Sequence, residues 1–370
     1  MIIKNALVYT EDHKFEKKDV RIEDERIAEI AENGQITATD EDVIDGEGMY
    51  AIPGLVDIHF HGAVGYDFCQ ASKEELLKIA EYEAKNGVLA ICPATMSYNE
   101  EILGHVMDKA ADYKEDTGAD LVGINMEGPF LDAKKKGAHV EGYIRKPDAG
   151  FFRELNEYSG NMVKLVTLAP NVDGAMEFID EVHNEVCISL GHTAADYDTA
   201  AEAMRRGAHH VTHLYNAMQP LAHREPGLIG AACDDGQCMA EMICDGIHIH
   251  PAVIRATFKM FGPERIVLIS DSMMATGMEN GTYQLGGQEV TMKDCKATLK
   301  DGTIAGSATN LYDCMRKAVS FGVPLEEAIF AATRNPAKSI GIYDEVGSLS
   351  VGKEADILLV TDDLELREVL

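Results

Sequence analysis

The residues of this 370-residue chain whose types and spacing suit catalysis are histidines and carboxylates that end short apolar segments. His59 and His61 lie in PGLVDIHFHG, Glu127 lies in NMEGPF, and His192 and His213 lie in SLGHT and VTHLYNAM. Two histidines and one carboxylate with an open coordination position are a common site for zinc or iron, and they leave room for a bound water. We therefore expect a divalent-metal site that activates water.

Two further features of this set have alternative interpretations. On a strand, His59 and His61 point to the same side, roughly 6 to 7 Å apart along the backbone. They are either ligands that converge on one ion or polar residues on a solvated strand face. Asp271 closes the last apolar run, in VLISDSM, where it is either a base that takes a proton from the metal-bound water or the N-cap of a following helix.

The segments that carry these residues predict the fold that positions them. Eight apolar runs alternate with helix-like stretches such as SKEELLKIAEYEAKNG, and this alternation is typical of a parallel sheet. The runs are GLVDIHF, GVLAICPA, DLVGINME, VKLVTLAP, EVCISLGH, AHHVTHL, CMAEMICD and RIVLISD. Eight such units predict an α/β fold of the (β/α)8 TIM-like barrel type, whose active site lies at the carboxyl ends of the strands.

The two ends of the chain differ from this pattern. Residues 1–52 and 343–370 contain short strand-like runs separated by Gly, Asp and Asn, as in DVRIEDERIAEI and GSLSVGKEADILLV. We expect a metal-dependent barrel over residues 53–342. We also expect a small β-sandwich domain built from both chain ends.

The composition limits the partners and the location of the protein. The chain has 33 Lys+Arg against 63 Asp+Glu, a formal charge of −30, which argues against nucleic acid and requires a local positive site for any anionic ligand. The opening MIIKNALVYTEDHK is charged too early for a signal peptide, and no apolar run approaches membrane-spanning length. Eight scattered cysteines without paired spacing fit a reducing compartment. We expect a cytoplasmic protein with no nucleic-acid or membrane partner.

Several motifs, in this order, resemble the N-acetylglucosamine-6-phosphate deacetylase family of the amidohydrolase superfamily. They are PGLVDIHFHG, MEGPFLDAKKKGAH, IRKPD, VTLAPN, GHTAADY, THLYNAM, HREPGLIGA, DGIHIHP, SDSM, IAGSA and ATRNPAKSIG. The resemblance spans nearly the whole chain. THLYNAM followed by REPG is specific to this family, whereas HxH and GSLSVGKEADIL are shared across the superfamily.

The resemblance implies a metal-dependent hydrolase of amino-sugar catabolism that removes acetate from a phosphosugar. Glu127, His192 and His213 would hold the principal metal, and Asp271 would transfer protons. Because the chain keeps His59 and His61, it would bind a second metal with Glu127 as the bridge, and the metal would be Zn, Fe, Mn or Co.

The resemblance also implies the substrate contacts and a homodimer. His139 would polarise the substrate carbonyl, and His248 would reach the phosphate in a neighbouring subunit. The other implied substrate-binding residues are Ala138, Asn216, Ala217, Arg224, Ile304, Ala305 and Gly306.

Two alternatives to this activity stay open at this point. The substrate is either the glucosamine or the galactosamine epimer, since one hydroxyl orientation leaves the catalytic set unchanged. A protein of this fold can also be a non-catalytic scaffold, although such scaffolds usually lose ligands and this chain keeps all five together with Asp271.

Overall fold

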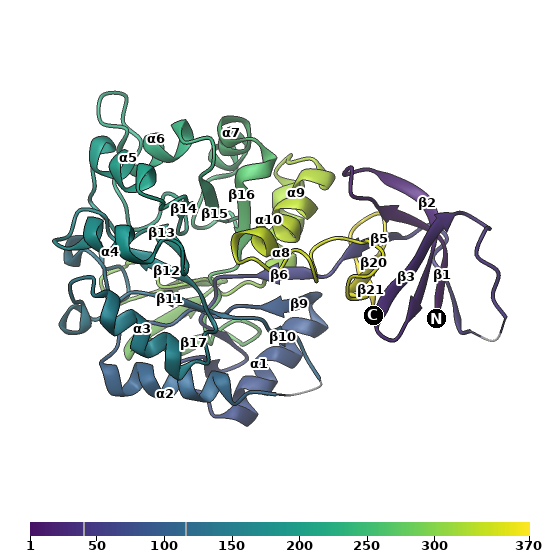
Figure 1. Cartoon of the computed structure of the whole chain (residues 1–370), viewed down its shortest axis with the longest axis horizontal. Helices are drawn as coiled ribbons and strands as arrows, with labels where there is room; N and C mark the ends of the chain where they lie inside the picture. The colour runs from purple at the N-terminus through teal and green to yellow at the C-terminus, as the bar shows by residue number, and fades with distance from the viewer. Residues whose placement is uncertain (40, 115–116) are drawn as a thin grey trace.

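The structure is a computed structural model, and it describes residues 1–39, 41–114 and 117–370 (Figure 1). Its larger part is built on parallel strands, and every one of the eight predicted runs contains at least one of them. One sheet has the order β11 (Ile124–Glu127), β12 (Val163–Leu168), β13 (Cys187–Leu190), β14 (His210–Val211), β15 (Met239–Ile243) and β16 (Ile266–Ile269). A second has the order β10 (Asp120–Leu121), β9 (Val88–Ile91) and β6 (Leu55–Asp57).

Hydrogen bonds join these two sheets at both edges. A parallel bridge links Ala94, beyond β9, to Asn125 of β11. On the other side the Asp271 N–H donates to the His59 carbonyl at 2.9 Å, and the His61 N–H donates to the Ser272 carbonyl at 2.7 Å. The parallel strands therefore curl around a common interior, and the predicted α/β class is confirmed.

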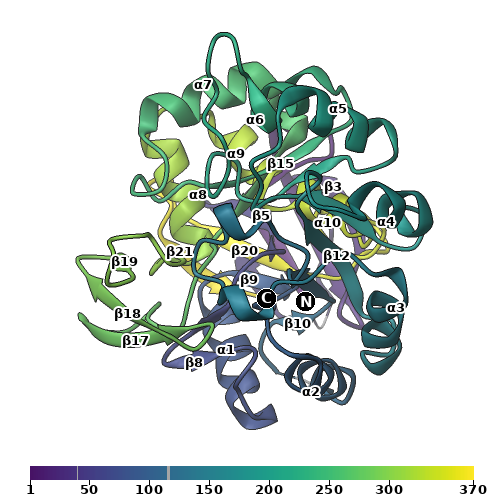
Figure 2. The ribbon, with the colours of Figure 1, turned by 90° about the vertical axis from the view of Figure 1, so that its left-hand side faces the viewer.

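Helices surround the parallel strands on the outside (Figure 2). They are α1 (Lys73–Lys85), α2 (Glu100–Ala111), α3 (Ala149–Tyr158), α4 (Ala175–Val182), α5 (Tyr197–Arg205), α6 (Gly227–Asp234), α7 (Pro251–Phe261), α8 (Leu311–Ser320), α9 (Leu325–Ala332) and α10 (Arg334–Ser339). Helix α1 shows why they form where they do, because Ser72 and Glu75 make a reciprocal capping box and Leu76 and Ile79 face the core. Across the described ranges, no helix combines the length and apolarity needed to cross a membrane.

Both chain ends contribute to one seven-stranded sheet, which lies beside the larger part (Figure 1). Its strands are β1 (Ile2–Tyr9), β2 (Phe15–Glu23), β3 (Arg26–Glu32), β4 (Val43–Asp45), β5 (Tyr50–Pro53), β20 (Ile357–Val360) and β21 (Leu366–Val369). The order is β21-β20-β5-β1-β2-β3, with β4 also paired to β1. Ile3, Val8, Val20, Ile357 and Leu359 form its buried core together with neighbouring apolar residues, so residues far apart in the sequence share one hydrophobic cluster.

A partly buried carboxyl group, that of Asp356, lies where this sheet meets the larger part. The Gly54 N–H donates to the Asp356 carbonyl at 2.9 Å. Burial of the Asp356 carboxyl, together with the negative charges of Glu354 and Asp120, raises its pKa to about 7. This junction therefore holds an acid that the folded protein keeps protonated more readily than the unfolded chain does.

The sequence pattern did not predict a small antiparallel sheet between β16 and α8. It consists of β17 (Gly281–Leu285), β18 (Gln288–Lys293) and β19 (Lys296–Thr298). The Gln288 side-chain amide donates to the Ala138 carbonyl at 2.5 Å, which ties this sheet to the loop after β11. The remaining short elements are β7 (Gly62–Ala63), β8 (Tyr66–Asp67) and three 3-10 helices at Ala133–Lys135, Glu141–Tyr143 and Pro263–Arg265.

Candidate metal centre and active site

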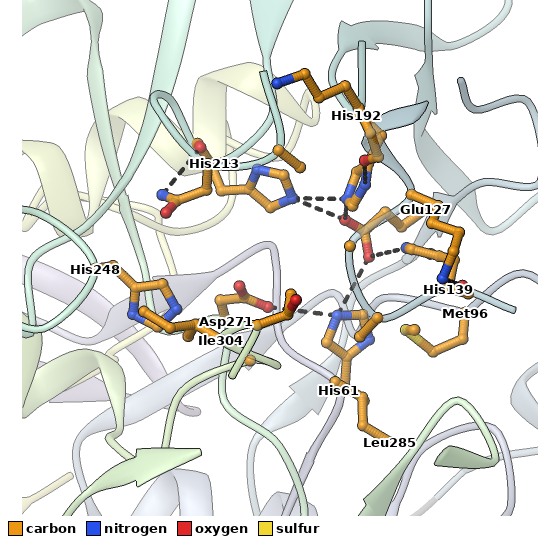
Figure 3. Close-up of a pocket in the computed structure, with 18 of the residues that line it drawn as sticks. His61, Met96, Glu127, His139, His192, His213, His248, Asp271, Leu285 and Ile304 are labelled. Atoms are coloured by element: carbon orange, nitrogen blue, oxygen red, sulfur yellow. Dashed lines mark hydrogen bonds and ion pairs between the residues drawn. The ribbon is translucent and has the colours of Figure 1, made fainter. Parts of the chain in front are cut away.

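A cavity of about 540 Å³ opens at the carboxyl ends of the parallel strands (Figure 3). Histidines and carboxylates from several strand ends line it, and its volume is typical of a site for a small molecule. These residues are His61, Glu127, His139, His192, His213, His248 and Asp271. The curled arrangement of the parallel strands thus brings together residues that lie up to about 200 positions apart in the sequence.

The buried carboxylate of Glu127 is the centre of this group (Figure 3). Its Oε1 lies 2.9 Å from His192 Nε2 and 3.0 Å from His213 Nε2. Its Oε2 lies 3.3 Å from His61 Nε2 and 3.4 Å from His139 Nε2. One carboxylate therefore contacts imidazoles on both of its oxygens.

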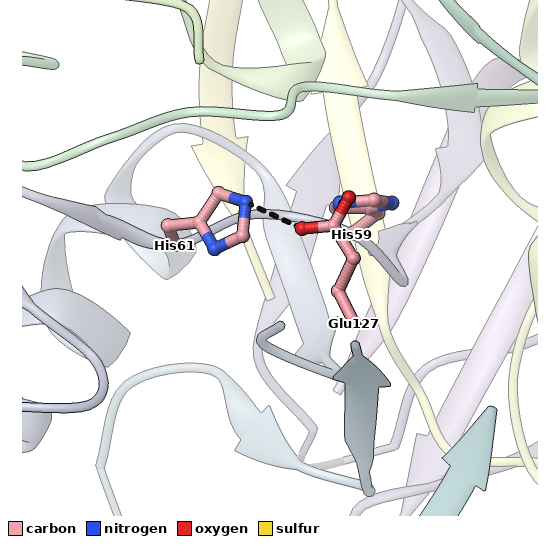
Figure 4. Close-up of side chains that lie close together, drawn as sticks. All are labelled: His59, His61 and Glu127. Carbon is pink, nitrogen blue, oxygen red and sulfur yellow. Dashed lines mark ion pairs between the residues drawn. The ribbon is translucent and has the colours of Figure 1, made fainter. Parts of the chain in front are cut away.

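Two overlapping triads have the spacing of metal ligands. In His59–His61–Glu127 (Figure 4) and in Glu127–His192–His213, one ligand atom from each residue lies within 4.8 Å of the others, and every residue is buried. Glu127 belongs to both triads, which is the arrangement that a bridging carboxylate needs. Two imidazoles and a carboxylate are ligands suited to zinc and other first-row divalent ions.

The backbone orients two of these histidines as ligands. His192 Nδ1 lies 2.9 Å from the Lys135 carbonyl, and His61 Nδ1 lies 3.2 Å from the Ala94 carbonyl. Because a carbonyl oxygen only accepts, each Nδ1 carries a hydrogen, and Nε2, which faces Glu127, is the nitrogen left to bind a cation. Metal-binding histidines are held in this way, so the residues present fit a divalent cation.

His139 has the opposite arrangement. The Ser97 backbone N–H donates to His139 Nδ1 at 3.0 Å, so the ring hydrogen is on Nε2, which faces the cavity side of Glu127. Burial lowers the pKa of His139 to about 4, so the ring is neutral near pH 7. His139 is therefore a neutral hydrogen-bond donor, which suits a group that polarises a carbonyl.

Asp271 borders the cavity and is 8% exposed. Its Oδ1 lies 3.4 Å from His61 Nε2 and 3.9 Å from His59 Nε2. The helix N-cap interpretation is wrong, because β16 ends at Ile269, no helix begins within the described residues 270–280, and the chain instead forms turns and a bridge. The carboxylate is thus free of a capping role and points to the triads.

The sequence profile of the Amidohydrolase family matches residues 50–369. This chain belongs to the amidohydrolase family. The N-acetylglucosamine-6-phosphate deacetylase of Bacillus subtilis (strain 168) is 35% identical over 373 residues, which cover 99% of this chain and 94% of that protein. The resemblance seen in the sequence motifs is therefore confirmed.

Two other relatives of this amidohydrolase bear on its substrate. A mutant N-acetyl-D-glucosamine-6-phosphate deacetylase from Mycobacterium smegmatis, solved in complex with N-acetyl-D-glucosamine-6-phosphate, has a TM-score of 0.93 at 31% identity and covers 100% of this chain and 97% of its own. The N-acetylgalactosamine-6-phosphate deacetylase of Escherichia coli O157:H7 is 32% identical and covers 100% of this chain and 97% of its own length.

The amidohydrolase cavity contains most of the substrate-binding residues that the motifs implied. Lining it are Ala138, His139, Asn216, Ala217, His248, Ile304 and Gly306. Ala305 is buried behind the lining, and Arg224 is exposed on a loop that borders a different hollow. The structure therefore does not bring Arg224 to the cavity of its own chain.

His248 lines the cavity of its own chain, whereas the resemblance assigned it to a neighbouring subunit. Its Nδ1 lies 2.8 Å from Asp245 Oδ2. Burial opposes protonation of His248, but the hydrogen bond and the negative charge of Asp245 outweigh it and raise the pKa of the imidazole. His248 thus favours the cationic form at the edge of the cavity.

Three consecutive lysines that sequence reasoning did not single out also line this cavity, Lys134, Lys135 and Lys136. Lys135 Nζ donates to the Met218 carbonyl at 3.1 Å, and Lys136 Nζ donates to the His139 carbonyl at 3.3 Å. None of the three lysines pairs with a carboxylate of the described residues. A run of three cations beside a candidate catalytic histidine, in a chain of charge −30, is the signal in the sequence from which a local positive site could have been predicted.

Proposed function

We propose that this amidohydrolase removes the acetyl group of N-acetylglucosamine 6-phosphate by hydrolysis, giving glucosamine 6-phosphate and acetate. The observation that carries the proposal is the meeting of Glu127, its surrounding imidazoles and Asp271 in one cavity at the carboxyl ends of the strands. The full-length similarity to deacetylases of this substrate supports the choice of amide.

The two triads would hold two divalent cations, with Glu127 shared between them. A bound divalent cation lowers the pKa of water, so that hydroxide is present near neutral pH. Asp271 would accept the proton of the attacking water and return it to the departing amine. His139 would donate its Nε2–H to the oxygen on which negative charge develops.

The cationic edge of the cavity supports binding of the phosphate. His248 with its raised pKa and the lysine run Lys134–Lys136 offer positive charge in a strongly acidic chain. We propose that His248 contacts the phosphate in its own chain and not in a neighbouring subunit, because it lines its own cavity. Arg224 is exposed and lies outside that cavity, so we propose that it acts on the phosphate across a homodimer.

We also propose finer features of the fold and location. The hydrogen bonds that join the two parallel sheets support a closed (β/α)8 barrel over residues 53–342. The shared sheet of the chain ends supports a small domain of residues 1–52 and 343–370, which we propose is of the β-sandwich type. All eight cysteines are free thiols, which supports a reducing compartment such as the cytoplasm.

The test is acetate release by the purified protein, combined with elemental analysis of bound metal. N-acetylglucosamine 6-phosphate, N-acetylgalactosamine 6-phosphate and unphosphorylated N-acetylglucosamine are compared under the same conditions. We expect the highest kcat/KM with the first sugar. A higher kcat/KM with N-acetylgalactosamine 6-phosphate would support deacetylation of that epimer, the second candidate function, which the similarity to the Escherichia coli enzyme favours. No acetate release from any of the three sugars by metal-loaded protein would indicate a non-catalytic scaffold.

A further inference from the structure

A charged residue, Glu241, lies in the middle of the buried strand β15, whose sequence is MAEMI. Its side chain is 0% exposed. Burial of a carboxylate is costly unless hydrogen bonds compensate for it, so its partners indicate its role. Both of its close partners are residues of the two triads.

Glu241 Oε2 lies 2.8 Å from His59 Nδ1 and accepts the His213 backbone N–H at 3.0 Å. A carboxylate only accepts, so His59 Nδ1 carries a hydrogen and Nε2 is the nitrogen left to bind a cation. This Nε2 is buried, has no hydrogen-bond partner among the described residues, and lies 3.5 Å from Glu127 Oε1. His59 Nε2 is therefore a potential metal ligand that faces the Glu127 carboxylate shared by the two triads.

Glu241 does for His59 what backbone carbonyls do for His61 and His192, but with a full negative charge. A charge-assisted hydrogen bond is roughly twice as strong as a neutral one, and a carboxylate partner also makes the imidazole a more basic ligand. The other oxygen of Glu241 lies 3.8 Å from His210 Nδ1, and that ring contacts Ser189 Oγ at 3.0 Å. This oxygen of Glu241 makes no hydrogen bond among the described residues, so the two contacts through Oε2 are what hold the carboxylate.

We propose that Glu241 is a positioning residue that holds His59 in its ligand tautomer and so sets the affinity of the His59–His61–Glu127 triad for a divalent cation. This proposal rests on the two-cation part of the proposed function. Glu241 contacts only the backbone of the other triad, at His213, so the Glu127–His192–His213 triad depends on it less.

The test measures zinc affinity, with a zinc chelator as competitor, in the full-length protein and its variants. Glu241→Gln keeps an acceptor and removes the charge, whereas Glu241→Leu removes both. Loss of such a partner typically costs 10- to 100-fold in metal affinity. We expect the second zinc to bind about 10-fold more weakly in the Gln variant and about 100-fold more weakly in the Leu variant, with the first zinc little changed.

Two controls separate positioning from general destabilisation. Glu83 is equally buried and makes no hydrogen bond within the described part of the chain, so Glu83→Gln and Glu83→Leu remove a carboxyl group at matched burial and should leave both zinc affinities unchanged. If Glu241 acts through His59, then Glu241→Gln should have no further effect on zinc binding in a His59→Ala background.

The proposal also has a readout that needs no Glu241 variant. In zinc-loaded unmodified protein labelled with ¹⁵N-histidine, the His59 resonances, assigned with His59→Ala, should show the Nδ1–H tautomer. An Nε2–H tautomer overturns the proposal, as does native affinity for both zinc ions in Glu241→Leu or a single zinc in the unmodified protein. Acetate release is measured separately, so an inactive protein with the expected zinc affinities refutes the proposed activity and leaves the role of Glu241 supported.

Discussion

Replacing Asp271 with Asn is the most direct test of the proposed chemistry, because it removes the base and keeps the shape of the side chain. Asp271 has a φ of +48°, a left-handed conformation that Asn adopts as readily as Asp. The variant should therefore fold. Among the described residues, the only contacts of the Asp271 side chain with the triads are 3.4 Å to His61 and 3.9 Å to His59, both longer than a strong hydrogen bond.

These contacts set the expected magnitudes. A positioned general base contributes about 10² to 10⁴ in rate, which corresponds to about 2.7 to 5.4 kcal/mol of activation free energy. One weakened contact with His61 is worth at most about 1 kcal/mol of stability, so the melting temperature should move by only a few degrees. The predicted loss is thus a loss of turnover and not of fold or metal.

The assay measures kcat for acetate release at saturating substrate, bound metal per chain and melting temperature on one preparation. Asp301→Asn is the matched control, since Asp301 lines the same cavity but is exposed and has no contact with the triads. We expect kcat of Asp271→Asn to fall at least 100-fold with metal content retained, and kcat of the control to stay near the native value. Near-native turnover of Asp271→Asn would refute the mechanism even if every metal ligand is correct.

Three other predictions follow from the site and the fold. Replacing His59 and His61 with Ala should lower bound zinc from two ions to one per chain by elemental analysis; one ion in the unmodified protein with zinc in excess contradicts this. Arg224→Ala should mainly raise KM for the phosphosugar, because a guanidinium is a bidentate phosphate donor. If Arg224 acts across a dimer, mixing the Arg224→Ala and Asp271→Asn proteins should restore activity at low substrate concentration. Equal turnover of the unphosphorylated sugar by the native enzyme would remove the basis for this role. Asp356 has a pKa raised from 3.8 to about 7 in the folded protein, so the folded state binds more protons than the unfolded state in that window and stability falls as pH rises through it. The melting temperature of Asp356→Asn relative to the native protein should therefore increase between about pH 5 and about pH 8, and a constant difference would contradict the assignment.

The sequence was sufficient for the strands and for the residues at their ends. Buried parallel strands are short apolar runs, and their carboxyl ends meet at one face, so the spacing of His59, Glu127, His192 and His213 predicted their convergence. These residues do lie together, because their positions depend on local strand geometry and a single topology. Their roles as ligands stay predictions.

Features that depend on contacts between distant loops were not predictable in the same way. The β17–β19 sheet lies outside the alternation of strands and helices from which the fold was predicted. The position of Arg224 outside the cavity depends on the path of an exposed loop. Asp271 followed by Ser272 reads as a helix start, but Ser272 instead pairs with Ser307, a residue 35 positions later in the chain. Glu241 was visible only as a charge inside an apolar run, and its partners became apparent once the fold placed His59 and the His213 backbone beside it.

The seven-stranded sheet has a consequence for synthesis of the chain. Strand β5 pairs with β1 on one side and with β20 on the other, and β20 is separated from β5 by more than 300 residues. As the chain emerges from the ribosome, the edge of β5 has no partner until residues 357–369 have been made, although the strands before it are among the first to appear. An unpaired strand edge is a template for association with other chains. Nascent chains that stall before β20 has been made should therefore be more prone to aggregate than completed ones.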